Sequence, residues 1–179
     1  MSKVKLTNVR LSFPSLWKMS DFNGQSTGKY EATFLIPKDD PQAKAIQEMV
    51  KSVGAQELGK DWAKAKLCIY DGDLKEYDGY AGHWAIKASN RKRPVVIDRD
   101  KSMLAEEDDV LYAGCYVNAS ISISAFSGQW GKFVSATLLG IQFSKAGDSF
   151  GGDGGNAIDD FDHEGEPASD SQYDDDAPF

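Results

Sequence analysis

The sequence has few of the residues that build catalytic and metal centres. Its 179 residues include only two cysteines, Cys68 and Cys115, and two histidines, His83 and His163. Two isolated cysteines provide neither a disulfide framework nor the spacing of a structural zinc site. A Ser-His-Asp or Cys-His pattern is also missing. We therefore expect a protein that is not an enzyme and that needs no metal ion and no cofactor.

Long hydrophobic runs are missing as well. The N-terminal segment Met-Ser-Lys-Val-Lys-Leu alternates polar and apolar residues and has no apolar signal core. No stretch approaches the roughly 20 apolar residues that a membrane-spanning helix requires. Two cysteines without a framework fit a reducing compartment. We therefore expect a cytoplasmic protein without a membrane partner.

Basic residues are missing from the C-terminal end. The stretch from Asp148 to Phe179 contains 11 acidic and no basic side chains, whereas the chain before it holds all 20 basic residues and 17 of the 28 acidic ones. The body therefore has a net charge of about +3 and the tail one of about −11. The tail opens with the glycine-rich segment 147–155, and glycine loses much backbone freedom on ordering. We predict a disordered acidic tail over residues 147–179 and one folded domain over residues 1–146.

The end of the tail has the composition of a docking peptide. The chain finishes with Asp174, Asp175, Asp176, Ala177, Pro178 and Phe179. We predict that Phe179 enters an apolar pocket of a partner, that the acids meet basic residues, and that Pro178 limits the entropy lost on docking. A tail that only improves solubility is the alternative. The tip resembles that of bacterial single-stranded DNA-binding proteins, apart from Ala177 where a larger aliphatic residue is usual, and this resemblance implies recruitment of replication and repair partners.

Alternating polar and apolar residues dominate the first part of the folded domain. A first strand alternates from Val4 to Phe13, a change of phase at Thr7-Asn8 indicates a bulge, and Pro14 is expected to end the strand. A second strand is expected over residues 30–36.

Helical spacing follows the second strand. Asp40-Pro41 is typical of a helix start, and apolar residues at helical spacing continue until Gly54, where we expect the helix to stop. A second short helix is expected over residues 55–66. We interpret the segment 40–66 as an insert packed on a β-body.

The longest alternation in the chain runs from Val110 to Phe126, with apolar residues on one face and polar and aromatic residues on the other. A turn at residues 127–131 and a returning strand at residues 132–143 follow it. Two shorter strands are expected at residues 84–89 and 95–97. The fold class that these elements predict is mainly β, an OB-fold-like small antiparallel barrel with a helical insert and a disordered acidic C-terminal tail.

Aromatic and basic side chains occur close together in the second half of the domain. Proteins that bind single strands without reading sequence stack bases on rings and contact phosphates with cations, and each stacked base contributes about 1–3 kcal/mol. A strand tryptophan such as Trp84 fits a core equally well, and a basic run is often only a solvated loop. The residues that we predict to bind single-stranded DNA are Tyr77, Tyr80, Trp84, Lys87, Arg91, Lys92, Arg93, Tyr112, Tyr116, Phe126, Trp130 and Lys132.

Three segments of the domain carry a family resemblance. Lys87–Pro94, Tyr112–Ala119 and the glycine-rich hairpin around Trp130 are similar to a family of bacteriophage single-stranded DNA-binding proteins. That family has an OB-fold and an acidic C-terminal tail. The resemblance implies sequence-independent coating of single-stranded DNA in phage replication, recombination or repair, partner proteins from these processes, and a place in the cytoplasm of the bacterial host.

Charge and composition together suggest a mechanism. A body of about +3 attracts DNA weakly at long range, so local clusters must hold the phosphates. The tethered acidic tail has an effective concentration of order millimolar at the same surface, and we expect it to compete with DNA there. The alternative is a protein-interaction or DNA-mimic protein that acts through its tail without binding DNA. RNA binding, a cation on the acidic residues of loop 98–109, and a homodimer are also left open.

Overall fold

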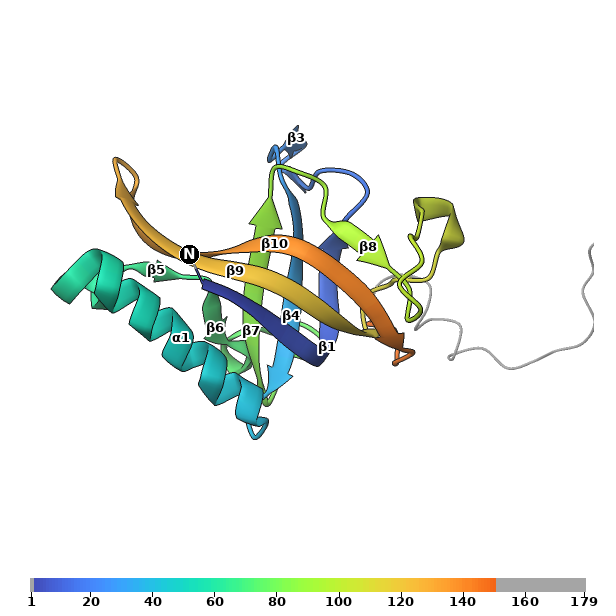
Figure 1. Cartoon of the computed structure of the whole chain (residues 1–179), viewed down its shortest axis with the longest axis horizontal. Helices are drawn as coiled ribbons and strands as arrows, with labels where there is room; N and C mark the ends of the chain where they lie inside the picture. The colour runs from blue at the N-terminus through green and yellow to red at the C-terminus, as the bar shows by residue number, and fades with distance from the viewer. Residues whose placement is uncertain (1, 151–179) are drawn as a thin grey trace, which may run out of the picture.

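The computed structural model describes residues 2–150, which form a closed β-barrel (Figure 1). Within this range the long strands are β1 (Ser2–Ser15), β4 (Tyr30–Pro37), β7 (His83–Asn90), β9 (Tyr116–Gly128) and β10 (Gly131–Lys145). β1 pairs antiparallel with β4 and β9, β4 with β7, and β9 with β10. A parallel pairing of β10 with β7 closes the barrel. This topology confirms the predicted OB-fold.

Short elements fill the connections between the long strands. They are β2 (Asp21–Phe22), β3 (Gln25–Ser26), β5 (Lys66–Leu67), β6 (Ile69–Asp71), β8 (Val95–Ile97), η1 (Gly59–Lys64), η2 (Gly72–Leu74) and η3 (Glu106–Asp108). Among residues 2–150, no helix combines the length and the apolar character needed to cross a membrane. The predicted docking tip, residues 174–179, lies outside the described residues.

β1 bends twice, and the bends allow it to pair with two neighbouring strands. The register with β9 shifts between Leu6 and Val9, which confirms the predicted bulge, and Asn8 has a positive φ of 54°. A second shift, in the register with β4, follows Ser12, and the strand continues through Pro14 instead of ending there. The coiled strand therefore pairs with β9 along its first half and with β4 along its second half.

The core fills the inside of the barrel. Alternating residues of β9 point inward, and Val117, Ile121 and Ile123 are fully buried. Inward residues of the other strands and of the helix complete the same cluster. Cys115 is buried in it and Cys68 packs against it, and burial raises the pKa of the Cys68 thiol to about 11. Both thiols are free, in agreement with the sequence.

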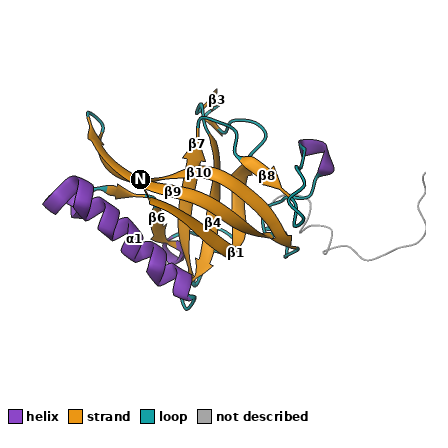
Figure 2. Cartoon of the chain, in the orientation of Figure 1, coloured by secondary structure: helices purple, strands orange, loops and turns teal. Residues whose placement is uncertain are grey.

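The helix α1 (Pro41–Leu58) packs along one side of the barrel (Figure 2). Asp40 caps it, since its side chain accepts a hydrogen bond of 2.9 Å from the Gln42 backbone N–H. The prediction that Gly54 stops the helix was wrong. Gly54 is instead a packing position, because a Cβ there would lie 3.2 Å from both Trp62 Cβ and Val134 Cγ2. The backbone thereby approaches η1 and β10 closely.

The strand predicted from Val110 to Phe126 begins later in the structure than expected. β9 starts at Tyr116, whereas residues 110–115 form a loop that carries Tyr112. Gly114 breaks the extended conformation with a φ of 110°. The Gly114 N–H still donates to Leu11 O, and the Leu11 N–H donates to Cys115 O, so the loop stays attached to β1. The turn predicted at residues 127–131 is a tight hairpin in which Gly128 pairs with Gly131.

The segment after β6 depends on a close backbone approach at Gly72. A Cβ at this position would lie 2.3 Å from Tyr80 O and 2.5 Å from His83 O, and backbone carbonyls cannot move away cheaply. Gly72→Ala should therefore lower the free energy of unfolding by more than about 2 kcal/mol in chemical denaturation. Gly128→Ala is the matched control, because a Cβ there meets nothing within 4 Å, and it should change stability by less than about 0.5 kcal/mol. Equal stability of the two variants would contradict this account.

Candidate nucleic-acid interface

The outer face of the sheet β1–β4–β7 is defined by residues that lie directly opposite one another. Arg10, Leu35 and Ala85 form one row across the three strands. Ser12, Thr33 and Lys87 form the next row. Opposed residues project from the same side of a sheet, so both rows face away from the barrel interior. We call this surface the outer face.

Tyr80 covers the middle of the outer face. Its side chain is fully buried and packs with Leu35 and Ala85. Its hydroxyl lies 2.9 Å from Ser12 Oγ, and burial raises its pKa. The prediction that Tyr80 offers a free ring for DNA bases therefore needs correction, because the ring has no accessible face in this conformation. Tyr80 instead anchors the segment 70–82 to the sheet.

Two ion pairs hold the same segment from its other end. The Lys38 ammonium lies 2.7 Å from Asp71 and 2.6 Å from Asp73. Hydrogen bonds from Lys38 lower the pKa of both carboxyl groups, so the pairs persist through neutral pH and are lost only as the pH falls through the lowered values. Asp73 also accepts a hydrogen bond of 2.7 Å from the Gly82 N–H. The turn that carries Tyr77 is thus fixed at both ends.

Phe13 and Tyr77 form an exposed pair of rings beside Tyr80. Their centroids lie 5.0 Å apart in an edge-to-face arrangement, and the side chains are 57% and 51% exposed. Phe13 has a φ of 45°, a left-handed conformation that is uncommon for a bulky residue. By its place in the alternation, Phe13 would share the buried face of Leu11. The left-handed backbone and the register shift after Ser12 turn the ring outward instead. No pattern in the sequence signals this reversal.

A second group of rings and cations surrounds Arg10. Its guanidinium carbon lies 4.3 Å from the centroid of Phe150 and 5.6 Å from that of Tyr116. The Lys145 ammonium lies 4.8 Å from the Tyr116 ring. Such contacts are cation–π interactions. We call Phe13, Tyr77, Arg10, Tyr116, Lys145 and Phe150 together the aromatic–cationic surface.

Tyr112 attaches the beginning of the tail to the domain. Its hydroxyl donates to Gly147 O at 2.8 Å and accepts from the Gly147 N–H at 3.0 Å. The polar end of Tyr112 is therefore engaged with the chain itself. Residues 147–150 lie against the barrel. The folded contacts therefore extend to Phe150, four residues beyond the domain end predicted at residue 146.

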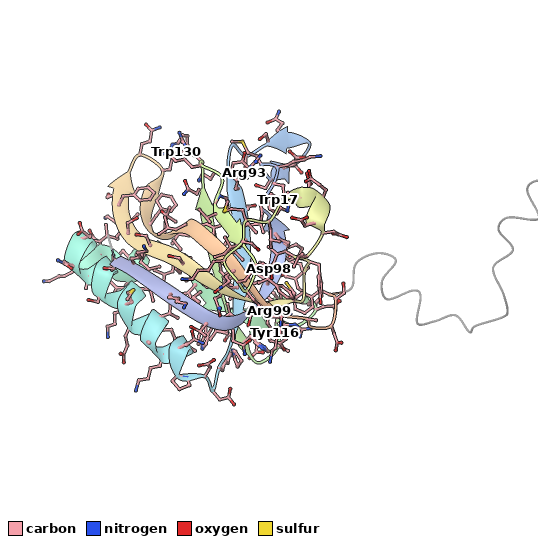
Figure 3. The ribbon with its side chains drawn as sticks, turned by 45° about the vertical axis from the view of Figure 1, so that its right-hand side comes forward. Trp17, Arg93, Asp98, Arg99, Tyr116 and Trp130 are labelled. Atoms are coloured by element: carbon pink, nitrogen blue, oxygen red, sulfur yellow. The ribbon has the colours of Figure 1, made fainter. Side chains whose placement is uncertain are left out.

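The basic run Arg91–Arg93 is exposed in the turn between β7 and β8. The Arg93 guanidinium lies 5.8 Å from the Tyr30 ring and donates to Trp17 O at 3.1 Å. Lys87 lies on β7 below this turn and faces Glu31 at 3.4 Å. In Figure 3, Arg93, Trp17 and Trp130 lie toward one end of the molecule, and Tyr116 lies toward the other.

The β9–β10 hairpin presents the most exposed ring of the predicted set. Trp130 is 83% exposed at the tip. Phe126 is 52% exposed and stacks on Phe133 with centroids 5.1 Å apart. The Lys132 ammonium pairs with Asp61 at 2.8 Å, and this hydrogen bond lowers the pKa of the Asp61 carboxyl. The hairpin is therefore held to η1 at its base, whereas its tip is accessible.

The sequence left open whether Trp84 binds bases or packs in the core, and the structure places it against the core. It is half-buried, packs against the core cluster, and lies opposite Ile36 on β4. The Lys38 ammonium lies 5.2 Å from its ring. The structure thus brings Tyr77 and Tyr116 to the aromatic–cationic surface, places Lys87 on the same outer face, and separates Trp84 from them.

Other features of the described residues are less suited to bases. A hollow of about 340 Å³ lies over β1, β9, β10 and β8, with Lys3 and Lys5 beside apolar Val95 and Leu139. It contains no aromatic side chain. Among residues 2–150, no three His, Cys, Asp or Glu side chains are placed to hold a metal ion.

A closed OB barrel with exposed rings and cations on its outer face defines a class: OB-fold proteins that carry the groups used for single-stranded nucleic acid. The comparisons with known proteins narrow this class. The chain belongs to the family of phage single-stranded DNA-binding proteins represented by that of Enterobacter phage Enc34, whose family model matches residues 2–175. This confirms the predicted family, and with it the expectation of a binding protein that is not an enzyme.

Individual proteins resemble the chain over most of its length. The chain is 43% identical over 171 residues to a protein named p50 from Acyrthosiphon pisum secondary endosymbiont phage 1, across 89% of this chain and 92% of that protein. It resembles the Enc34 single-stranded DNA-binding protein, solved in complex with ssDNA, with a TM-score of 0.72 and 30% identity, over 84% of this chain and 90% of the other. The single-stranded DNA-binding protein gp2.5 of bacteriophage T7 shares the fold, with a TM-score of 0.58, 15% identity, and 94% and 99% coverage.

The different roles of Tyr80 and Tyr77 predict different effects on stability. Tyr80→Ala removes a fully buried ring and should lower the free energy of unfolding by about 3 kcal/mol or more. Tyr77→Ala removes a half-exposed ring and should cost less than about 1.5 kcal/mol. Denaturant titration of both variants measures the two values. A Tyr80 variant as stable as the parent protein would show that Tyr80 does not anchor the segment.

Proposed function

We propose that this protein coats single-stranded DNA without reading its sequence. The observation that carries the proposal is the exposed Phe13–Tyr77 pair, which lies on the outer face that also carries Arg10 and Lys87. Rings and cations arranged together in this way bind bases and phosphates of any sequence. A family relative solved in complex with ssDNA supports the same function.

We assign two kinds of contact to the predicted residues. Bases stack on Phe13, Tyr77 and Tyr116, and the exposed rings of Phe126 and Trp130 extend the platform toward the hairpin. Phosphates are contacted by Lys87, Arg91, Lys92, Arg93 and Lys132. Tyr80 and Tyr112 support the surface from below or from its border, whereas Trp84 packs against the barrel core. The protein performs this task in replication or recombination of phage DNA, in the cytoplasm of the bacterial host.

We further propose that the acidic tail competes with DNA. The described chain leaves the domain at Phe150, within the aromatic–cationic surface, and the residues that follow it carry most of the tail's negative charge. A tether at this position keeps the acids near the cations of the outer face. When DNA occupies the surface, the tip Asp174, Asp175, Asp176, Pro178 and Phe179 becomes available to replication or recombination proteins.

Stacking and charge can be separated by their salt dependence. Phe13→Ala and Tyr77→Ala should each weaken binding of oligo-dT by about 5- to 100-fold, because each removes one stacked base, and should leave the slope of log affinity against log salt unchanged. Arg91→Ala combined with Lys92→Ala should instead make that slope shallower by about 1 to 2. Fluorescence anisotropy across salt measures both. Met103→Ala is the control, since this side chain is 70% exposed outside the surface and should have no effect.

Removal of residues 151–179 should tighten oligo-dT binding at low salt, because the acidic competitor is lost, and the gain should vanish as salt screens the tail. Anisotropy titrations of the full chain and the truncated chain at about 0.05 M and 0.5 M salt measure this. Equal affinities at low salt would contradict competition by the tail while leaving DNA binding intact. No binding by either protein would instead support a DNA mimic.

A further inference from the structure

Phe150 occupies a prepared position on the outer face. Its ring packs against Leu35, Tyr80 and Ala85, beneath the Arg10 guanidinium at 4.3 Å. Gly79 borders the ring so closely that a Cβ at this position would lie 2.4 Å from Phe150 Cε1 and Cζ. A flat six-membered ring thus fits between a guanidinium plane and a bare stretch of backbone.

The backbone on either side of Phe150 is also held. The Phe150 N–H donates to Ala113 O at 3.0 Å, and Arg10 Nη2 donates to Asp148 O at 2.6 Å. At Gly114 a Cβ would lie 2.1 Å from Asp148 O, so only glycine permits the approach. We call residues 147–150 the strap. The strap makes these contacts through its own backbone groups and through one ring, which makes it separable from the barrel core.

The chemistry around Phe150 matches what a nucleobase needs. Arginine guanidinium planes stack on bases as they do on aromatic side chains. The exposed Phe13–Tyr77 pair adjoins the site through Tyr80, whose ring centroid lies 5.1 Å from that of Tyr77. A DNA strand crossing these rings would meet Arg10 and find its stacking position already filled.

We propose that the Phe150 position is a nucleobase subsite and that Phe150 is an internal substitute for the base. In the free protein the ring stacks on Arg10 and closes the subsite. When single-stranded DNA binds, the strap leaves, a base takes the place of the ring, and the acidic tail moves away with the strap. This inference rests on the proposed DNA binding and names a further contact within it.

The first test is the Phe150→Ala variant of the full-length chain. Because a base no longer has to displace a ring, the affinity for oligo-dT should rise by about three- to thirtyfold, as expected when the binding-competent fraction increases by that factor. The gain should persist at high salt, since the competitor is uncharged. The gain from removing residues 151–179, which leaves Phe150 in place, should by contrast disappear at high salt.

The second test couples Phe150 to Arg10. Arg10→Lys preserves the charge but removes the planar group that stacks on a ring. In this background Phe150→Ala should give less than about a twofold gain, because the opened subsite no longer holds a base. A full gain in the Arg10→Lys background would show that the base does not bind there.

The proposal fails if folded Phe150→Ala protein binds oligo-dT no more tightly than the parent protein at either salt concentration. Phe150 would then be a structural anchor. If Phe150→Ala does not fold, Phe150→Leu fills the apolar space without offering a ring to Arg10. A smaller gain in the same direction is expected from it, because a base then displaces a side chain that does not stack on the guanidinium. If the full-length and truncated chains both ignore oligo-dT, the proposed function fails, and that result differs from binding with no gain.

Discussion

The contact of Tyr80 with the outer face is the interaction on which the proposed binding surface depends. Its ring covers Leu35 and Ala85, and its hydroxyl meets Ser12 on the neighbouring strand. This contact fixes the segment 70–82 on the outer face, where Leu35 and Ala85 would otherwise be exposed. Tyr77 and Phe13 gain their positions from it, because their rings rest against Tyr80 at 5.1 Å and 6.4 Å. The buried ring thus supports the exposed rings. Because these rings are already held in place, they lose little conformational entropy when a ligand binds.

The charge distribution fits the proposed competition between the tail and DNA. The folded part is nearly neutral, so its cations act locally, and several of them are already engaged: Lys132 with Asp61, Lys87 with Glu31, and Lys38 with Asp71 and Asp73. In the proposed mode of binding, stacking then carries a large share of the affinity. In the proposed mechanism, a polyanion tethered at Phe150 opposes the charged part of binding, whereas the Phe150 ring opposes the stacked part. The two forms of competition differ in salt dependence, because screening weakens only the first.

Much of the fold was predictable because it rests on local periodicity. The alternation of β9 and the Thr7-Asn8 phase change identified the inward residues and the bulge. The site was less predictable, since it depends on contacts between distant segments. Tyr80 and Tyr77 look alike in the sequence, and only the return of segment 70–82 onto Ser12 distinguishes the buried ring from the exposed one. Phe13 follows the inward phase in sequence but turns outward through its left-handed backbone. Gly79 and Gly114 leave room for the strap, but the sequence does not show which segment fills that room.

The location of the DNA on the barrel is the central claim, and photochemical cross-linking tests it most directly. The full-length protein would be irradiated in complex with oligo-dT, and the cross-linked peptides identified by mass spectrometry. The account predicts cross-links at Phe13 and Tyr77, the exposed rings of the outer face. Cross-links confined to the hollow at Lys3 and Lys5, with none at these two rings, would contradict it.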